Sequence, residues 1–318
     1  MSELVAGVDL GGTKIQSIVV RAGGVAGTAR VPTPERGPDD VIEAIAETVR
    51  AVLMQAGATD GELRAVGIGT PGKVEAASGT VALAKNVPGF TEQVELGPKV
   101  SERLERVTVT VDNDVRVATL GEFRRGAGRP YRDLLGVFVG TGVGGGLVLG
   151  GTLRDGRGAA GEIGHAVVKD GGRRCSCGRR GCLEAYAGRG CMEQHARKLV
   201  KKGKRTVLFD LMEEKKRNRL TSGVIAAALE QGDRMAVGLV EDAVWALGLA
   251  LASAQNLIDV EAVIIGGGLG DRLGKPFADR VAESMQPHLF VPDRPPALLT
   301  SELGDLSGAV GAAVLAGG

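Results

Sequence analysis

A short apolar strand, a glycine turn and a second strand occur together twice in this chain, at positions far apart. The first copy covers residues 4–20 and the second covers residues 134–149. Apolar runs rich in β-branched residues predict strands, and a glycine turn between two such runs predicts a hairpin. We therefore expect two similar hairpins and a weak internal repeat in the fold.

The segments between and after these hairpins alternate between helical and strand-like patterns. Val41, Ile45, Val49 and Val52 have helical spacing and predict a helix over Pro38–Ala56. Further strands are predicted at Leu63–Ile68, Thr108–Val111 and Ala262–Ile265, and helical segments at Ala187–Gln255 and Ala309–Ala316. This alternation predicts the α/β class.

Length and charge limit what the chain binds and where it works. Its 318 residues are 43% hydrophobic, which is enough for about two domains. The 39 basic and 38 acidic residues give no overall field that would attract nucleic acid or a membrane.

The apolar stretch Ala243–Ala254 is shorter than the roughly 20 residues that span a bilayer, so we expect a buried helix there. With no secretory signal pattern at the start, we expect a cytoplasmic protein.

The first glycine turn combines the residue types that bind phosphate. Gly11 and Gly12 expose backbone N–H groups, and Thr13 and Lys14 add further donors. Asp9, just before the turn, can hold a water molecule on Mg²⁺. The alternative is an ordinary hairpin turn, because paired glycines also suit tight hairpins.

The second turn, Gly140–Gly146, holds five glycines, which is more than a hairpin requires. Its leading residues Gly140, Thr141 and Gly142 would form a second phosphate clamp. Neither turn has the spacing of a P-loop or of a dinucleotide-binding Rossmann unit. A third glycine run, Gly266, Gly267 and Gly268, follows a predicted strand and would suit adenine or ribose lying against the backbone.

One imidazole and three thiols lie within eighteen residues. The four residues are His165, Cys175, Cys177 and Cys182. Such a set suits tetrahedral Zn²⁺ with no open position, which is typical of a structural zinc site. A disulfide is the rival interpretation, but clustered cysteines in a cytosolic protein more often bind metal or act in catalysis.

Taken in order, these motifs resemble the ROK family of repressors, open reading frames and sugar kinases over nearly the whole chain. The most specific segment is Glu162-Ile163-Gly164-His165 followed by Cys175-x-Cys177-Gly178-x-x-Gly181-Cys182-Leu183-Glu184. The resemblance implies an actin-like ATPase fold (ribonuclease H-like), in which two α/β lobes have a nucleotide and sugar cleft between them. We expect a small lobe at 1–113, joined again by 305–318, and a large lobe at 114–304 with the zinc site.

The resemblance also assigns roles to single residues. Asp114 matches the family's catalytic base, and the neighbouring Asn113 matches a sugar ligand. Helix capping is the alternative role for the Asp112–Asp114 cluster. The full set of sugar ligands that the resemblance implies is Gly72, Asn86, Asn113, Asp114, Glu162, His165 and Glu184. Nucleotide ligands implied are Asp9, Gly11, Gly12, Thr13, Lys14, Gly140, Thr141, Gly142, Gly266, Gly267 and Gly268.

The family contains several activities, so the resemblance leaves alternatives open. We expect an ATP-dependent kinase of the 6-hydroxyl of glucose, with Mg²⁺ accompanying ATP and polyphosphate as an alternative donor. A kinase of N-acetylglucosamine or N-acetylmannosamine is the second reading, and a non-catalytic sugar-sensing regulator is the third. The resemblance further implies a homodimer. Val115 and Arg116 depart from the Ala-Asn pair that often follows the family's catalytic aspartate.

Overall fold

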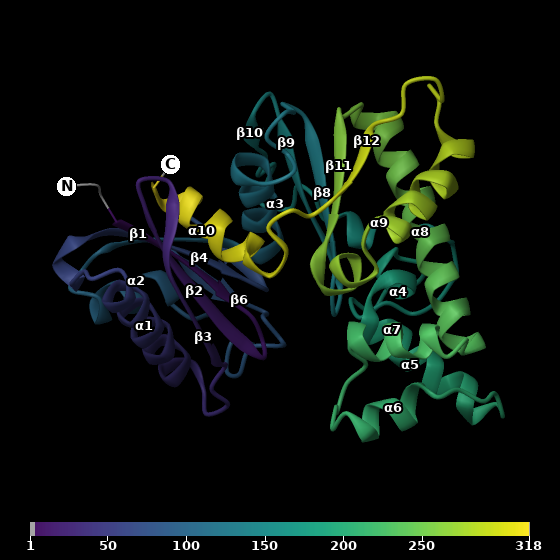
Figure 1. Cartoon of the computed structure of the whole chain (residues 1–318), viewed down its shortest axis with the longest axis horizontal. Helices are drawn as coiled ribbons and strands as arrows, with labels where there is room; N and C mark the ends of the chain where they lie inside the picture. Colours follow the sequence, from purple (N-terminus) through teal and green to yellow (C-terminus); the bar gives the residue numbers. More distant parts are fainter. Residues whose placement is uncertain (1–3, 318) are drawn as a thin grey trace. The chain divides into compact units, whose positions relative to one another are not determined.

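The computed structural model describes residues 4–317. Their contacts divide the chain into two compact units. The first unit comprises the residues up to Pro130, residues 146–160 and the chain from Asp305 onward. The second comprises residues 131–145 and 161–304. Each unit combines strands and helices (Figure 1), which confirms the predicted α/β class.

The first sheet has the strand order β3-β2-β1-β4-β7. Its strands are β1 (Leu4–Leu10), β2 (Lys14–Arg21), β3 (Gly24–Pro32), β4 (Leu63–Thr70) and β7 (Thr108–Asn113). β1, β2 and β3 pair antiparallel, whereas β4 is parallel to β1 and β7 is parallel to β4. The predicted N-terminal hairpin is therefore confirmed as β1 and β2.

The second sheet repeats this arrangement with the order β10-β9-β8-β11-β12. Its strands are β8 (Leu134–Val139), β9 (Val143–Leu149), β10 (Thr152–Leu153), β11 (Ala262–Gly266) and β12 (Ala297–Thr300). Numbered within each sheet, both orders read third, second, first, fourth, fifth. β11 again runs parallel to the first strand, β8, and β12 runs parallel to β11. The weak repeat in the sequence thus marks the start of two sheets of equal topology.

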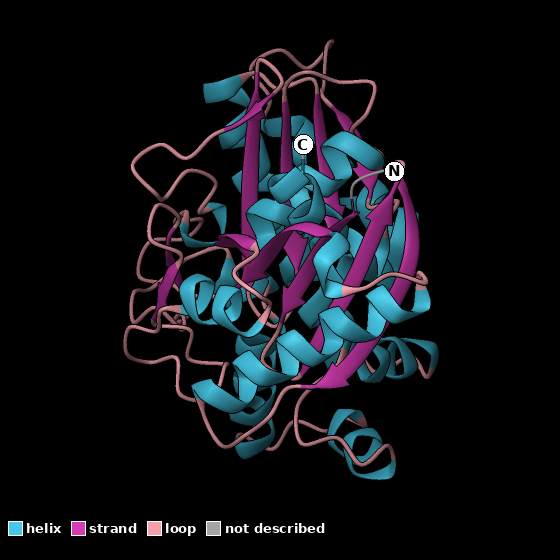
Figure 2. Cartoon of the chain, turned by 90° about the vertical axis from the view of Figure 1, so that its left-hand side faces the viewer, coloured by secondary structure: helices cyan, strands magenta, loops and turns pink. Residues whose placement is uncertain are grey.

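Four helices belong to the first unit, and helices lie against the strands of the sheets (Figure 2). They are α1 (Pro38–Gln55), α2 (Leu96–Arg103), α3 (Asp114–Arg125) and α10 (Ser307–Gly317). The unit also contains a small hairpin of β5 (Lys73–Glu75) and β6 (Thr80–Ala82) and the 3-10 turn η1 (Asp60–Glu62). A further 3-10 turn, η4 (Gly304–Leu306), begins at the last residue of the second unit and leads into α10. α1 begins at a proline, for which the first helical turn is a favoured place. It buries Val41, Ile45, Val49 and Val52 as its spacing predicts, and Gly57 follows with a positive φ of 66°.

α10 packs on β1, β4 and α3 through glycines that allow very close approach (Figure 1). A Cβ atom on Gly67 of β4 would lie 1.7 Å from the Ala312 oxygen. A Cβ atom on Gly311 would lie 1.6 Å from the Val117 oxygen of α3. This packing joins the C-terminal helix to the first unit.

The contact-based units differ from the boundary expected after Asn113. Residues from Asp305 group with the first unit, as in the expected division, but residues 114–130 and 146–160 also do so. The packing of α3 on α10 accounts for the placement of 114–130. Because such packing joins segments far apart in the chain, composition alone does not locate this boundary.

The second unit is rich in helices, as predicted for the stretch 187–255. Its helices are α4 (Glu184–Ala187), α5 (Arg189–Lys201), α6 (Leu208–Glu214), α7 (Ser222–Glu230), α8 (Arg234–Ile258) and α9 (Gly267–Met285), with 3-10 turns η2 (Ile163–His165) and η3 (Gln286–His288). α9 contains a kink with non-helical angles at Gly274.

α8 extends well beyond the predicted apolar stretch. It has 25 residues and is long and apolar enough to cross a membrane by length and composition. In the structure 67% of its most apolar window is buried, and α9 packs along it. α8 is therefore the core helix of the second unit, which confirms the expected buried helix.

Candidate nucleotide and sugar site

Several of the predicted functional residues meet at one edge of the first sheet. The strand register places Asp9 opposite Gly69 and Gly69 opposite Asp112. One step further, Thr70 of β4 lies opposite Asn113. This is the carboxyl end of the parallel strands, the edge at which open α/β sheets bind their ligands.

The first phosphate turn is a tight connection between β1 and β2. The Gly11 N–H donates to the Lys14 oxygen at 2.9 Å, and Thr33 Oγ1 donates to the Gly11 oxygen at 2.7 Å. A Cβ atom on Gly12 would lie 2.2 Å from the Asn86 oxygen, so only glycine fits here. The structure therefore brings the phosphate turn and Asn86 together, although 74 residues separate Gly12 from Asn86 in the sequence.

Asp9 lies below this turn in a desolvated position. Burial raises the pKa of its carboxyl group to about 6, the Lys14 cation opposes the rise, and the nearby Asp305 adds to it. Lys14 Nζ pairs with Asp305 Oδ1 at 3.4 Å. Bringing a cation to Asp9 would relieve the burial cost of its charge, which suits a residue that supports Mg²⁺.

Gly72 lies after β4 in the same region as Asn86. Its φ of 101° is one that residues with side chains rarely adopt. A Cβ atom there would lie 2.7 Å from the Ala82 oxygen and 2.8 Å from the Ala84 Cβ. Gly72 thus lets the chain pass close to the segment that leads into Asn86.

Asn113 and Asp114 form the junction between β7 and α3. Asn113 is the N-cap, and its Oδ1 accepts hydrogen bonds from the N–H groups of Val115 at 3.0 Å and Arg116 at 3.3 Å. Asp114 is the first helical residue, where a helix terminus stabilises negative charge. Capping therefore occupies the Asn113 oxygen and leaves its amide NH₂ as the group suited to donate to a sugar.

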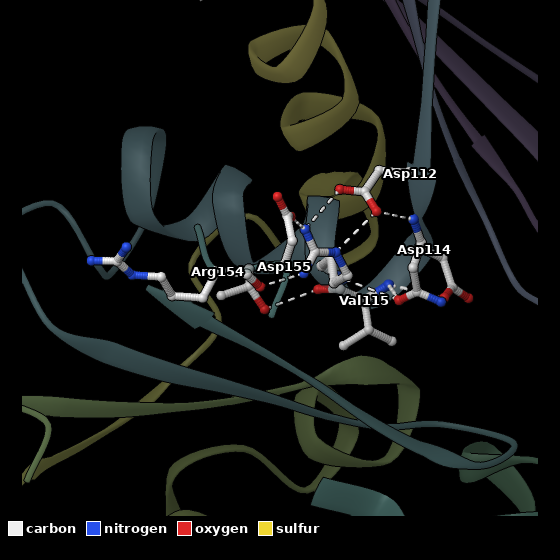
Figure 3. A network of polar contacts seen from close by, with 8 residues as sticks. Asp112, Asp114, Val115, Arg154 and Asp155 are labelled. Carbon is white, nitrogen blue, oxygen red and sulfur yellow. Dashed lines mark hydrogen bonds and ion pairs between the residues drawn. The ribbon is translucent and has the colours of Figure 1, made fainter. Parts of the chain in front are cut away.

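Arg116, which sequence reasoning did not select as a site residue, bonds to Asp112 at this junction. Figure 3 shows the surrounding network, with Asp112 and Asp114 on one side and Arg154 and Asp155 on the other. Arg116 Nε donates to Asp112 Oδ1 at 2.9 Å, and Arg116 also contacts Asp155 Oδ1 and the Arg154 oxygen. Burial disfavours the charge of Arg116, but the Asp112 and Asp155 carboxylates outweigh burial and raise its pKa. Asp112 Oδ1 in turn accepts from the Asn113 N–H at 2.7 Å.

The second phosphate turn connects β8 to β9 in the second unit. The Gly140 N–H donates to the Gly142 oxygen at 2.9 Å. Glu184 lies beside it, with Oε2 accepting from the Val143 N–H at 3.0 Å. A Cβ atom on Gly142 would lie 2.4 Å from that same oxygen. Thr141 lies between these two glycines, in the turn as predicted.

Glu184 is 8% exposed and joins this turn to the cysteine loop. Its other oxygen, Oε1, accepts from Ser176 Oγ and lies 3.5 Å from Cys175 Sγ. Both carboxylate oxygens therefore have protein partners. The geometry adds a linking function to the sugar contact that the family resemblance implies.

His165, Cys175, Cys177 and Cys182 come together as the sequence predicts, with all four ligand atoms within 4.8 Å of one another. The Cys177 and Cys182 sulfurs are 3.8 Å apart, and Cys175 Sγ is 3.9 Å from His165 Nδ1. A tetrahedral zinc with Zn–S bonds of about 2.3 Å separates its sulfurs by about 3.8 Å. The donor set and its spacing thus fit zinc.

The second ring nitrogen of His165 points away from the sulfurs. His165 Nε2 lies 4.0 Å from Glu162 Oε2, with Glu162 directly before the η2 turn and His165 as its last residue. A Cβ atom on Gly164, within this turn, would lie 1.9 Å from the Val143 oxygen. Glu162 and His165 are therefore held against the end of the second phosphate turn.

The third glycine run joins the end of a strand to the start of a helix. Gly266 ends β11, and Gly267 and Gly268 open α9. Gly267 has a φ of 79°, and a Cβ atom there would lie 2.8 Å from the Val139 nitrogen. The run thus lies beside the strand that leads into Gly140.

Arg189 is a second residue that sequence reasoning missed. Its Nε donates to the Gly140 oxygen at 3.0 Å. It stands directly after Gly188 and two residues after the end of α4. A single basic residue in a sequence offers no hint of a neighbour 49 positions away.

Comparison with known proteins gives the same family over the whole chain. The sequence model described as the ROK family matches residues 5–318. A glucokinase of Streptomyces coelicolor is 36% identical and covers 98% of this chain and 97% of its own. An N-acetyl-D-glucosamine kinase of Escherichia coli is 33% identical, with coverages of 97% and 98%.

A solved structure with bound ligands is similarly close. The crystal structure of a ROK family glucokinase from Streptomyces griseus in complex with glucose and AMPPNP has a TM-score of 0.81 and 36% identity. The match covers 98% of this chain and 99% of that one. Its fold confirms the expected actin-like ATPase architecture of two α/β lobes.

Proposed function

The chain belongs to the ROK family, and from this premise we propose that it transfers the γ-phosphoryl group of ATP to the 6-hydroxyl of glucose. The observation that carries the proposal is the 36% identity, over nearly the full chain, to a kinase whose structure holds glucose and AMPPNP. Phosphoryl transfer requires a base, phosphate ligands and sugar ligands, and this chain has a residue for each role.

Asp114 is the proposed general base. In this role its carboxylate accepts the proton of the sugar 6-hydroxyl while that oxygen attacks the γ-phosphorus. The proton moves to the carboxylate, and ADP leaves with the electron pair of the broken P–O bond. Asn113 is the N-cap of α3 and directly precedes Asp114. Its amide NH₂ is the proposed donor to a neighbouring sugar hydroxyl.

The remaining assignments follow the family resemblance and the local geometry. The proposed sugar ligands of the first unit are Gly72, close to Ala84, and Asn86, close to Gly12. Those of the second unit are Glu162 and His165, which lie close to each other, and Glu184, which shares the neighbour Cys175 with His165. The N–H groups of Gly12 and Gly142 are the proposed phosphate donors, with Thr13, Lys14 and Thr141. Gly11 and Gly140 are proposed to shape the two nucleotide-binding turns, because their N–H groups bond to the Lys14 and Gly142 oxygens. Gly266, Gly267 and Gly268 are the proposed adenosine contact.

ATP-dependent transfer implies Mg²⁺, which neutralises the charge of the phosphates when it is bound. Asp9 is the residue of the first turn suited to hold it through a water molecule, because burial leaves its carboxylate poorly solvated. In the same unit, Lys14 supplies a fixed cation near the turn.

We propose a structural zinc at His165, Cys175, Cys177 and Cys182 that also orients a sugar ligand. Zinc on His165 Nδ1 would fix the ring tautomer and direct Nε2 toward the sugar. Chelation should remove one zinc per chain, measured by elemental analysis, and weaken glucose binding, measured by calorimetry. Normal glucose affinity in zinc-free, folded protein would contradict the proposal that zinc orients His165 for sugar binding.

A matched variant controls the zinc experiment. Cys191 is buried on α5 outside the four-residue cluster. Cys191→Ser should keep one zinc per chain, whereas Cys182→Ser should lose it.

The acceptor is tested by turnover across sugars. Steady-state kcat/KM with ATP should be compared for glucose, N-acetylglucosamine, N-acetylmannosamine and fructose, with ³¹P NMR to locate the phosphate. We expect glucose to give the highest value and a 6-phosphate product. A higher value for N-acetylglucosamine would favour the second activity, which a 33% identical relative carries. No turnover with any sugar would favour a regulator.

Donor, assembly and location complete the proposal. ATP should support turnover better than polyphosphate at equal phosphoryl concentration, because the third glycine run suits an adenosine. We also propose a homodimer and a cytoplasmic location, as the family resemblance implies. Sedimentation velocity at micromolar concentration tests the dimer.

A further inference from the structure

Arg189 opens α5 and reaches the second phosphate turn of the same unit. Its backbone N–H and its Nε both donate to the Gly140 oxygen, at 3.2 and 3.0 Å. The next residue repeats the link, since the Gly190 N–H donates to the Thr141 oxygen at 2.9 Å. Nε therefore fixes the guanidinium plane and leaves the two terminal nitrogens for another partner.

No carboxylate balances this cation among residues 4–317. Arg189 makes no ion pair in the described part of the chain, and its one side-chain hydrogen bond is to Gly140. Burial lowers the pKa of its guanidinium, and no neighbouring acid counters the effect. The cation is thus partly desolvated and lacks a counter-ion, which is unfavourable unless a ligand supplies negative charge.

The guanidinium lies beside the start of α9, and the Ser222 hydroxyl of α7 lies beside the same point. A Cβ atom on Gly268 would lie 3.7 Å from Arg189 Nη2 and 3.7 Å from Ser222 Oγ. Gly268 belongs to the first turn of α9, a helix of 19 residues. A guanidinium without an ion pair, a hydroxyl and the N-terminus of one helix therefore lie together, and each of them favours an anion.

We propose that Arg189 binds a phosphate of the donor nucleotide, between the Gly140–Gly142 turn and the glycines that open α9. The inference deepens the proposed function and rests on a nucleotide as the donor. A planar guanidinium suits paired hydrogen bonds to phosphate oxygens. Gly268 has no side chain that would lie between the guanidinium and the Ser222 hydroxyl, both 3.7 Å from where its Cβ atom would be.

The test measures binding rather than turnover, with adenosine, Mg·ADP and Mg·AMPPNP as probes in calorimetry. Arg189→Gln keeps hydrogen-bond donors but removes the charge. It should weaken ADP and AMPPNP binding about tenfold to a hundredfold, the range for a charge-assisted hydrogen bond, and leave adenosine binding unchanged. Arg189→Lys should give an intermediate loss, because a point charge replaces a planar fork.

Arg197→Gln is the matched control on the same helix. Arg197 is paired with Glu193 and half exposed, so its variant should bind all three probes as the wild type does. Equal loss of adenosine and ADP in Arg189→Gln would overturn the inference and point to a role in shaping the turn. Unchanged ADP binding would also overturn it. Wild-type protein that binds no adenine nucleotide would instead refute the proposed donor itself.

Discussion

The end of β1 places a carboxylate where its charge is poorly solvated. Burial raises the pKa of Asp9 to about 6, from 3.8 for an unhindered aspartate. The native state therefore holds this proton more tightly than the unfolded chain does. The resulting stability is fully present below pH 3.8 and is lost as the pH rises through 6.

Asp9→Asn should consequently stabilise the ligand-free protein at neutral pH. A rise of about 2 pKa units corresponds to at most about 3 kcal/mol in the free energy of unfolding. The gain should be complete above pH 6, shrink between pH 6 and 3.8, and vanish below that range. Urea unfolding at pH 7.5, 5 and 3.5 measures it. An equal gain at all three pH values would contradict the account.

Arg116 illustrates how a single side chain supports the proposed catalytic junction of Asn113 and Asp114. It is 9% exposed and bonds to Asp112, which accepts from the Asn113 N–H. Its second carboxylate partner, Asp155, is largely exposed, so that contact is screened by solvent and contributes less. Arg116 is accordingly a positioning residue for Asn113 and Asp114.

Arg116→Ala should destabilise the protein by about 3 kcal/mol, because it leaves Asp112, whose side chain is only 14% exposed, without its cation. It should also lower kcat more than it raises KM for glucose, since the base loses its fixed position. Arg124→Ala on the exposed face of α3 is the control and should cost under about 1 kcal/mol. Equal kcat in Arg116→Ala and the wild type would remove the positioning role.

At the scale of elements, glycine decides where helices approach other backbone. Gly311 and Gly238 both lie inside helices, α10 and α8. A Cβ atom on Gly311 would collide with the Val117 oxygen, whereas a Cβ atom on Gly238 meets nothing within 4 Å. The same substitution should therefore have opposite effects at the two positions.

Gly311→Ala should lower the free energy of unfolding by several kcal/mol, because α10 must move away from α3. Gly238→Ala should raise it by about 0.5–1 kcal/mol through the higher helix propensity of alanine. Thermal unfolding of both variants measures the difference. Similar melting temperatures for the two variants would show that α10 is less tightly packed than the glycines indicate.

The sequence predicts those helices and strands whose own residues show a clear periodic or β-branched pattern. The spacing of apolar residues located α1 to within one residue, and β-branched runs located β1, β2 and β8. β3 was missed because Gly24 and Gly27 weaken its pattern, and pairing with β2 holds it in place. α2 was missed because Gly97 and Pro98 oppose helix in a segment that packing makes helical.

At the scale of the whole molecule, the sequence located most candidate site residues but not their links. The cysteine spacing predicted a cluster that the structure brings within 4.8 Å. By contrast, the contacts of Gly12 with Asn86 and of Glu184 with Val143 join distant segments. Arg116 and Arg189 were missed because the role of a single basic residue depends on the groups that it contacts in the folded structure, and the sequence does not show these contacts.

The weak repeat in the sequence corresponds to the first strands of two sheets that have the same strand order. Each sheet opens with a hairpin whose turn is rich in glycine, and each turn exposes N–H groups suited to phosphate. The first turn lies near Asp9 and the second near Glu184. Two turns of this kind, together with Asp114 as the proposed base, support phosphoryl transfer as the activity of the chain.

The most direct test of that claim is the turnover of Asp114→Asn with ATP and glucose. The amide keeps the size of the side chain and one oxygen that can accept from the Val115 N–H, but it does not act as a base at neutral pH. We expect kcat to fall by about a thousandfold or more while glucose still binds in calorimetry with near wild-type affinity. Turnover equal to that of the wild type would contradict the assignment of Asp114 as the base.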